Sequence, residues 1–312
     1  MGRIRIGTRG SKLALWQANH IADLLRQQYS DTEVELVIFT TKGDKILDKS
    51  LPSIGGKGLF TEELESALLD GGIDCAVHSL KDLPTQMPFG LEIGAIPQRA
   101  PVEDVLISKH NLTLENLPSG AKIGTSSLRR AAQIRHVRDD IEIIDIRGNV
   151  PTRIQKALDP EGDYDAIILA RAGVERLELM DNVAEILSTD VMLPAPGQGA
   201  IAVQCRDDNV DIFEPLTDLA TLLSVTAERS FLQRLQGGCS VPVAAYSTYE
   251  GNTLNFIGRV ASVDGQRWIE VTKQDMALAQ TKPYIIAEQV GRFAAVEAIN
   301  QGAKEILDEV KK

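Results

Sequence analysis

Short apolar runs alternate with segments of helical periodicity through the first part of the chain. Strands are predicted at residues 4–8, 34–40 and 73–79, and helices at 13–28 and 59–69. The helical segments carry apolar residues three and four positions apart, whereas the strands are short apolar runs. This strand–helix–strand order predicts an α/β unit with a largely parallel sheet.

The alternation restarts after residue 103 and predicts a second α/β unit of similar size. Its expected strands are 104–108, 121–125, 141–146 and 165–170, and its expected helices are 126–138, 151–158 and 171–178. The Pro- and Gly-rich stretch 193–205 ends in a strand-like run, which we expect to return to the first sheet. Two crossings, near 97–103 and 193–199, then give two lobes with a cleft between them.

The last third of the chain has a different pattern. A helix is predicted at 216–235, followed by strand-like runs at 241–249, 253–262 and 266–273 and a terminal helix over 282–309. This order predicts an α+β module with an antiparallel sheet. We therefore expect three domains: a discontinuous first domain of residues 1–99 and 197–215, a second domain of residues 100–196, and a C-terminal domain of residues 216–312.

Composition narrows the class of protein. Of the 312 residues, 43% are hydrophobic and 25% are charged, as in ordinary globular proteins. No apolar stretch is long enough to span a bilayer, and the sequence MGRIRIGTRGSK at the start lacks the apolar core of a secretory signal. The three cysteines (Cys75, Cys205 and Cys239) have no CxxC spacing. We therefore expect a cytoplasmic protein in a reducing compartment, with no disulfide framework, no thiolate zinc site and no membrane partner.

The net charge argues against a nucleic-acid partner but hides a local reversal. The chain carries a formal charge of −11, whereas nucleic acids and anionic membranes attract a positive field. Residues 122–156 nevertheless contain eight Lys or Arg against four Asp or Glu. This segment is thus positive within an acidic chain, which favours a small anion as ligand.

Two motif matches are chance. Residues 197–202 fit the dinucleotide fingerprint G-x-G-x-x-A, but prolines precede them and a strand-like run follows, whereas the fingerprint requires a strand before it and a helix after it. Residues 111–113 fit a glycosylation motif, but glycosylation requires secretion, which we do not expect for this chain. The four histidines are not clustered in the sequence. We therefore expect no nucleotide and no metal.

Polar residues follow the first and third predicted strands. Arg9 and Ser11 come directly after strand 4–8, where ligands bind in open α/β sheets and where a helix N-terminus favours anions. Asp82 and Lys81 follow strand 73–79. A carboxylate held at the cleft mouth can stabilise a developing cation, worth roughly 4 kcal/mol at contact distance. The plainer alternatives are Ser11 as a helix cap and Asp82 as a turn former.

Arginines follow three successive strands of the second unit. The segment Gly124–Arg130 offers hydroxyls, backbone N–H groups and the guanidiniums of Arg129 and Arg130. The segment Arg147–Arg153 places a similar set of groups after the next strand. Arg171 and Arg176 follow the next strand. One such pair of arginines usually only faces solvent. Three sets at the ends of successive strands should converge on one edge of the sheet. Because guanidiniums bind carboxylates bidentately, we expect a ligand with several acidic groups.

Two glycine-rich segments complete the candidate chemistry. Gly237 and Gly238 place Cys239 on a tight turn, which favours an attachment or nucleophile role over the alternative of a buried small side chain. No histidine lies nearby to act as a base. The segment 54–60 reads as a mobile loop whose Lys57 and Phe60 could close over a ligand.

Together these segments resemble the porphobilinogen deaminase (hydroxymethylbilane synthase) family over essentially the whole chain. The matching segments are TRGSKLALWQ (8–17), GGKGLF (55–60), HSLKDLP (78–84), GTSSLRR (124–130), RGNVPTR (147–153), ILARAG (168–173), PAPGQGA (194–200) and GGCSVP (237–242). The pair Glu228–Arg229, ten residues before Cys239, is specific to the family. Arg171 is the one local feature that the resemblance does not assign.

The resemblance implies a reaction, a cofactor and a fold. The family condenses four porphobilinogen molecules head to tail with release of ammonia, giving linear hydroxymethylbilane for tetrapyrrole and haem biosynthesis. A dipyrromethane cofactor, bound through a thioether, primes the chain. The expected fold is α/β, with two lobes resembling type II periplasmic binding proteins and a C-terminal domain that carries the cysteine. The expected protein is a monomer.

The resemblance also implies residue roles. Asp82 matches the catalytic aspartate, which hydrogen-bonds pyrrole N–H groups and stabilises cationic methylene-pyrrole intermediates, and Cys239 matches the cofactor attachment site. Matches to further cofactor-binding positions are Ser79, Lys81, Thr125, Ser127, Arg129 and Arg130. Matches to positions that serve the substrate or the growing chain are Arg9, Ser11, Gln17, Arg147, Arg153 and Arg176.

Two other classes of protein compete with this reading. A non-catalytic, two-lobed anion receptor or sensor would explain the cleft and the arginines, but it needs neither Cys239 nor Asp82. A nucleic-acid-binding regulator conflicts with the net charge and with the lack of aromatic residues among the basic ones.

Overall fold

A five-stranded sheet forms the first lobe of the computed structural model, which describes residues 2–45, 61–236, 241–275 and 283–310. The strand order is β2-β1-β3-β10-β4. The strands are β1 (Arg3–Arg9), β2 (Glu33–Phe39), β3 (Cys75–Ser79), β4 (Leu91–Ala95) and β10 (Ile201–Arg206). β10 alone runs against its neighbours, pairing antiparallel with β3 and β4. The predicted return of the chain to the first sheet after residue 193 is therefore confirmed.

The second lobe repeats this arrangement with its own strands. The order is β7-β6-β8-β5-β9, and here β5 alone is antiparallel to its neighbours. The strands are β5 (Asp104–Ser108), β6 (Lys122–Gly124), β7 (Glu142–Ile144), β8 (Ala166–Ala170) and β9 (Glu185–Leu187). Both sheets are largely parallel, as the alternation predicts. β4 and β9 are edge strands that the hydrophobic pattern did not indicate.

Helices cover the faces of both sheets. In the first lobe they are α1 (Lys12–Gln28), α2 (Lys42–Lys45), α4 (Glu62–Leu69) and α8 (Val210–Phe213), and in the second α5 (Leu128–Val137), α6 (Val150–Leu158) and α7 (Arg171–Arg176). Side chains cap three of the longer ones: the oxygens of Ser11, Ser127 and Asn149 accept from backbone N–H groups in the first turns of α1, α5 and α6. Each cap fixes the helix start at the end of a strand.

The C-terminal part packs a three-stranded antiparallel sheet against helices. The strands are β11 (Val243–Glu250), β12 (Thr253–Ala261) and β13 (Trp268–Asp275), and the helices are α9 (Leu219–Arg234), α10 (Pro283–Asn300) and α11 (Ala303–Val310). Its core is separate from those of the lobes and includes Phe231 and Phe256, whose ring centroids are 5.3 Å apart. The prediction of one terminal helix over 282–309 is wrong: Gly302, at φ +102°, separates α10 from α11.

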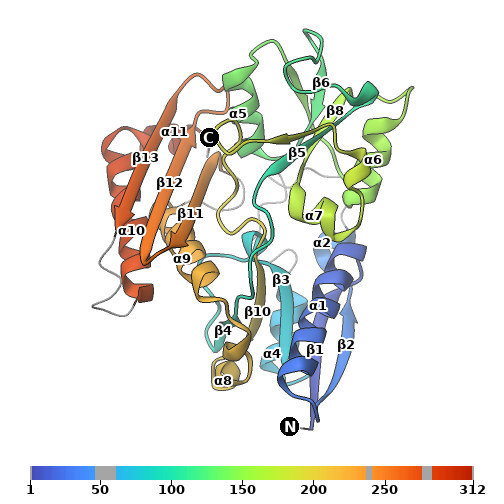
Figure 1. Ribbon diagram of the computed structural model, residues 1–312, viewed down its shortest axis with the longest axis vertical. Helices are drawn as coiled ribbons and strands as arrows, with labels where there is room; N and C mark the ends of the chain where they lie inside the picture. Colours follow the sequence, from blue (N-terminus) through green and yellow to red (C-terminus); the bar gives the residue numbers. More distant parts are fainter. Residues whose placement is uncertain (1, 46–60, 237–240, 276–282, 311–312) are drawn as a thin grey trace.

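The three parts meet around the two crossings. In Figure 1 the first lobe lies at the bottom, the second at the upper right and the C-terminal sheet at the left, with the crossings between them. The crossings touch: a Cβ on Gly199 would lie 2.5 Å from the carbonyl oxygen of Ala100. These observations confirm the expected architecture of two α/β lobes, the first built from two separate stretches of the chain, and an α+β domain. The residues at which the domains divide stay a prediction.

Within the described part of the chain, no helix combines the length and the apolar character that crossing a membrane requires.

Candidate active site

The turn after β3 presents Asp82 to solvent. Leu80 and Leu83 are buried on either side of it, and the Leu80 N–H donates to the carbonyl of Ala200, the residue just before β10. Arg229 of α9 reaches across and donates to the carbonyl oxygens of Leu80, Leu83 and Pro84 at 3.4, 3.2 and 2.6 Å. The turn is thus fixed from both sides while the Asp82 carboxylate stays exposed.

Lys81 points inward from the same turn. Its Nζ donates to Oε1 of Gln198 at 3.2 Å, on the second crossing. Burial, together with the nearby guanidinium of Arg130, lowers the pKa of Lys81 to about 8. The ammonium of Lys81 is therefore destabilised by its surroundings, and an added anion would stabilise it.

Arg129 and Arg130 share one buried carboxylate. Their Nη2 atoms donate to the two oxygens of Asp104 at 2.8 and 2.7 Å, and all three residues are buried. Burial by itself raises the pKa of Asp104, but the two guanidiniums outweigh it and hold that pKa well below its usual range. The anion partner expected for these arginines thus lies, in part, inside the protein.

The cluster of Lys81, Asp104, Arg129 and Arg130 still has an excess of positive charge. Three cations surround one carboxylate, and the buried Nε of Arg130 has no hydrogen-bond partner among the described residues. A buried N–H group without a partner is costly, and a buried net charge more so. The cluster is therefore suited to a ligand that brings carboxylates.

Arg147 and Arg153 follow β7 in the second lobe. Arg153 donates from Nε to the carbonyl of Gly148 at 2.7 Å. Burial and the charges of Arg130 and Arg147 lower the pKa of Arg153, while Asp145 and, to a smaller extent, Asp82 act in the opposite direction. Asp82 of the first lobe and Arg130 and Arg147 of the second therefore lie near enough to Arg153 for their charges to act on it.

The remaining first-lobe candidates lie at the ends of β1 and β3. Ser11 caps α1, because its Oγ accepts from the Ala14 N–H at 3.3 Å. The alternative role of Ser11 as a helix cap is therefore confirmed. Gln17 is buried and donates from Nε2 to Oγ of Ser79 at 2.9 Å, which ties α1 to the strand before Asp82. Arg9 ends β1 and lies near the buried His78, whose pKa it helps to lower.

Thr125 and Ser127 hold the start of α5. Oγ1 of Thr125 accepts from the Ser127 N–H at 3.2 Å, and Ser127 caps the helix that carries Arg129 and Arg130. Their hydroxyls thus position the arginines.

Arg176 has different surroundings from the other predicted arginines. It extends from α7, donates from Nη2 to the carbonyl of Gly199 at 2.8 Å and lies 5.4 Å over the ring of Trp16. Arg171, unassigned from the sequence, forms ion pairs with Glu103 and Glu175 at 3.4 and 2.7 Å. Arg171 therefore ties α7 to the first crossing.

Cys239, Lys57 and Phe60 lie outside the described residues. The other two cysteines, Cys75 and Cys205, are fully buried and form no disulfide. They occupy facing register positions on the neighbouring strands β3 and β10. In the described part of the chain, no three His, Cys, Asp or Glu side chains are placed to hold a metal ion together.

Sequence reasoning gave no role to the residue that joins the three parts. Glu228 of α9 is fully buried and accepts from Arg99 at 2.7 and 2.9 Å, from the Gly197 N–H at 2.7 Å and from the Ser247 N–H at 2.8 Å. One carboxylate thus binds both crossings and the C-terminal sheet. The available signal was a charged Glu–Arg pair in the middle of an otherwise largely apolar helix.

Comparison with known proteins agrees with this arrangement. The family model "Porphobilinogen deaminase, dipyromethane cofactor binding domain" matches residues 4–214, and "Porphobilinogen deaminase, C-terminal domain" matches residues 222–298. A porphobilinogen deaminase from Maridesulfovibrio salexigens is 49% identical over 313 residues, covering 99% of each chain. One from Desulfitobacterium hafniense is 49% identical over 314 residues, covering 100% of this chain and 98% of the relative.

Among solved structures, the periplasmic aliphatic sulphonate binding protein SsuA from Escherichia coli is 19% identical with a TM-score of 0.40, covering 75% of this chain and 70% of that one. This likeness is too weak to carry an argument. The two family models and the full-length relatives are decisive: the chain belongs to the porphobilinogen deaminase family.

Proposed function

We propose that this chain performs the reaction of its family with Asp82 as its catalytic carboxylate. That reaction condenses four porphobilinogen molecules head to tail, releases ammonia at each step and gives linear hydroxymethylbilane. The observation that supports Asp82 most directly is its place: an exposed carboxylate, on a turn fixed from both sides, near enough to Arg153 of the second lobe to act on its pKa.

Each addition generates a positive charge that Asp82 is placed to stabilise. The aminomethyl C–N bond of the incoming porphobilinogen breaks and ammonia leaves, so that a methylene-pyrrole cation remains. A C–C bond then forms to the free end of the growing chain, whose ring carbon loses a proton. A carboxylate at about 4 Å stabilises such a cation by roughly 4 kcal/mol at an effective dielectric constant near 20. Realised only in the transition state, this is about a thousandfold in rate.

The cationic residues are proposed to bind the carboxylates of cofactor and substrate. The dipyrromethane cofactor supplies the primer to which substrate units are added. We assign it to the residues around the buried cluster, namely Ser79, Lys81, Thr125, Ser127, Arg129 and Arg130. The Nε of Arg130, which has no hydrogen-bond partner in the described part of the chain, and the destabilised ammonium of Lys81 fit a group with carboxylates. Incoming substrate is assigned to Arg9, Ser11, Gln17, Arg147, Arg153 and Arg176.

Cys239 is proposed as the cofactor's attachment point. Cys75 and Cys205 are fully buried, and burial raises the pKa of both thiols, to about 12 for Cys205. A thiolate is the reactive form of cysteine, so neither of these two is suited to form a thioether. This supports Cys239 by elimination.

The role of Asp82 is tested by Asp82→Asn, which removes the charge and keeps the shape. We expect ammonia release from porphobilinogen to fall by about a thousandfold while the far-ultraviolet circular dichroism stays unchanged. Asp23→Asn, at an exposed position of α1, is the matched control and should keep wild-type turnover. Wild-type turnover in the Asp82 variant would contradict the proposed role.

We further propose a cytoplasmic monomer that binds neither nucleic acid nor membrane. The formal charge of −11 supports the absence of a nucleic-acid partner. Light scattering should then give the mass of a single 34.0 kDa chain, and a gel-shift titration with duplex DNA at low salt should show no complex. A dimer mass or a saturable DNA complex would overturn these points.

A further inference from the structure

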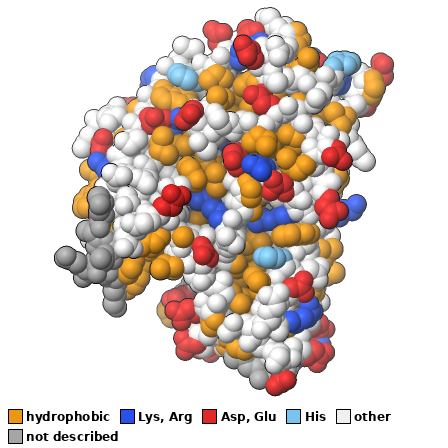
Figure 2. All heavy atoms as spheres, in the orientation of Figure 1, with side chains coloured by type: hydrophobic (Ala, Val, Ile, Leu, Met, Phe, Trp, Pro, Cys, Tyr) orange, Lys and Arg blue, Asp and Glu red, His pale blue; other side chains and the backbone are white. Residues whose placement is uncertain are grey.

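Acidic side chains lie beside the cations at the middle of the molecule. Figure 2 shows Lys and Arg side chains gathered on this face between the lobes, with Asp and Glu side chains next to them. An acid beside a binding arginine either holds the guanidinium in place or competes with an anionic ligand for it. The separation of the pair decides between the two roles, because a hydrogen bond fixes the guanidinium, whereas a longer separation leaves only the attraction between the charges.

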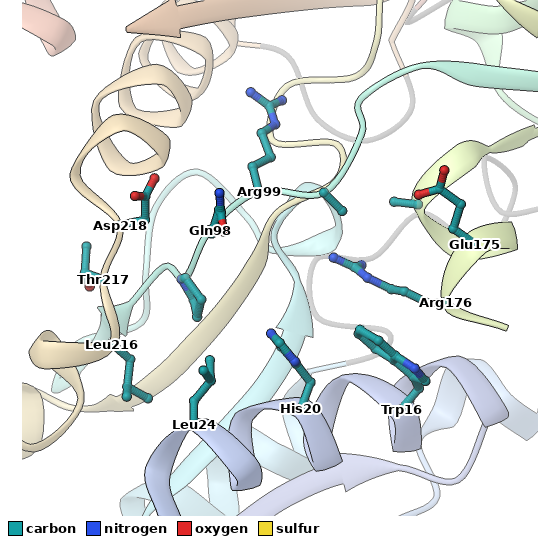
Figure 3. A pocket seen from close by; sticks show the side chains of 13 residues that line it. Trp16, His20, Leu24, Gln98, Arg99, Glu175, Arg176, Leu216, Thr217 and Asp218 are labelled. Carbon is teal, nitrogen blue, oxygen red and sulfur yellow. The ribbon is translucent and has the colours of Figure 1, made fainter. Parts of the chain in front are cut away.

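Two acids near the predicted arginines are engaged by hydrogen bonds. Asp104 is fully buried and accepts from two arginines of α5 at 2.8 and 2.7 Å. In Figure 3, Glu175 and Arg176 both extend from α7 at a hollow of about 580 Å³. Glu175 accepts from Arg171 at 2.7 Å. Asp104 and Glu175 are therefore structural partners that hold arginine side chains in place.

Asp145, the residue after β7, has a different relation to its arginine. Its Oδ2 lies 3.9 Å from Nε of Arg147, which is beyond the range of a hydrogen bond. The side chain of Asp145 is 53% exposed, whereas that of Arg147 is only 21% exposed. The Asp145 carboxylate therefore attracts the guanidinium without orienting it.

The backbone around Asp145 is held by two neighbouring segments. The hydroxyl of Tyr164 donates to the carbonyl of Asp145 at 2.9 Å, and Oγ of Ser126 donates to the carbonyl of Ile146 at 2.7 Å. The ring of Tyr164 lies against the end of β6, since a Cβ on Gly124 would come within 2.7 Å of it. The carboxylate is thus attached to a backbone position that the rest of the lobe fixes.

The charge of Asp145 also acts on Arg153, in the first half of α6. Burial and the charges of Arg130 and Arg147 lower the pKa of Arg153, and Asp145 is the acid that opposes them most. A positive charge at Arg153 is therefore already costly, and Asp145 compensates part of that cost. One half-exposed carboxylate thus offsets the charge of both arginines that follow β7.

We propose that Asp145 sets the affinity of the substrate site by competing with the carboxylates of the substrate for Arg147 and Arg153. This inference rests on the proposed function, which assigns both arginines to incoming substrate. Each porphobilinogen brings an acetate and a propionate, so arginines without an opposing acid would hold the growing chain more tightly at every step. Tighter binding of the ground state lowers KM without raising kcat. Asp145 thus limits ground-state binding, whereas Asp82 acts on the transition state.

A charge-removing variant tests this role. Asp145→Asn keeps the size of the side chain, and we expect KM for porphobilinogen to fall about fivefold while kcat does not rise. Asp145→Glu keeps the charge and should restore KM to within about twofold of the wild-type value. Asp163→Asn is the matched control, because Asp163 is an exposed acid that also lies near Tyr164, and it should leave KM unchanged.

Binding without turnover gives a second readout. The probe is pyromellitate, a planar ring with four carboxylates that cannot be condensed, and it is titrated into the holoenzyme by calorimetry. Its dissociation constant should fall about fivefold in Asp145→Asn. This difference should shrink as the salt concentration rises from about 0.05 M to about 0.5 M, because salt screens exposed charges. Local unfolding around residue 145 would instead weaken binding.

The proposal is overturned by an unchanged or higher KM in Asp145→Asn, by probe binding that is unchanged, weaker or absent in this variant, or by an equal effect of Asp163→Asn. Ammonia release by the wild-type holoenzyme, measured in parallel, tests the proposed function separately. Wild-type turnover with no effect of Asp145→Asn would keep the proposed function and refute the role of Asp145. Tighter probe binding in the variant, without turnover by the wild type, would do the reverse.

Discussion

His78 is a buried base directly beneath the residues that carry the site. It precedes Ser79 on β3, and its Nε2 lies 3.1 Å from Oε1 of Gln204 on β10. Burial is the main reason that its pKa falls from 6.5 to about 4, and the charge of Arg9 adds to the effect. A neutral His78 therefore belongs to the folded state at neutral pH.

This burial predicts a pH dependence of stability. Because the unfolded chain binds the proton more tightly, the free energy of unfolding should fall as the pH drops from 6.5 toward 4, by about 3 kcal/mol in total from this one group. The measurement is the difference in unfolding free energy between wild type and His78→Gln across this range. That difference should shift by this amount in favour of the variant, whereas His110→Gln should show no such shift. A pH-independent difference for His78→Gln would contradict the account.

The arginines show how much of the site was predictable at this scale. Their types and positions indicated an anion site, and in the structure the charges of Arg130 and Arg147 are near enough to Arg153 to lower its pKa. What the sequence lacked was Asp104, which comes 25 residues before Arg129 at the start of another strand. Local patterns do not reveal such a partner, because only the sheet order brings β5 beside β8 and under α5.

At the scale of elements, α9 links the C-terminal domain to both lobes. Arg229 holds the Asp82 turn, and its neighbour Glu228 holds the two crossings. Helical geometry puts adjacent residues about 100° apart, so one turn of this helix contacts two different segments. The mid-helix charges are thus structural contacts between the parts.

Glu228→Gln tests this link. Leaving Arg99 without its buried partner should lower the free energy of unfolding by about 3 kcal/mol, or more. The double variant with Arg99→Met should recover part of this loss, because no charge is then left buried and unpaired. Glu250→Gln, at the exposed end of β11, is the control. Chemical denaturation gives the values, and an unchanged midpoint for Glu228→Gln would show that the link contributes little.

Edge strands and helix breaks were the elements that the sequence predicted least well. β4 and β9 are edge strands of five and three residues whose buried positions do not form a continuous apolar run in the sequence. The break at Gly302 lies within a long helical periodicity that continues on both sides of it. By contrast, β3, β5 and β8 are buried on both faces, and their apolar runs were visible without any partner strand.

At the scale of the whole molecule, an acidic chain concentrates positive charge in one place. The formal charge is −11, yet Arg130 lies near enough to both Lys81 and Arg153 to lower the pKa of each, and Arg147 adds to the effect on Arg153. The positive field is therefore local, and it suits a small ligand with several carboxylates better than a long polyanion. The crossings and α9 then hold the two lobes around that field.

The attachment of the cofactor is the most direct test of this account. The intact mass of the purified native protein should exceed the mass of the chain by two porphobilinogen units less two ammonia molecules. Peptide digestion should place that excess on Cys239, and Cys239→Ser should lack it. An unmodified native chain that also fails to gain the adduct when porphobilinogen is added, or an adduct on Cys75 or Cys205, would contradict the account.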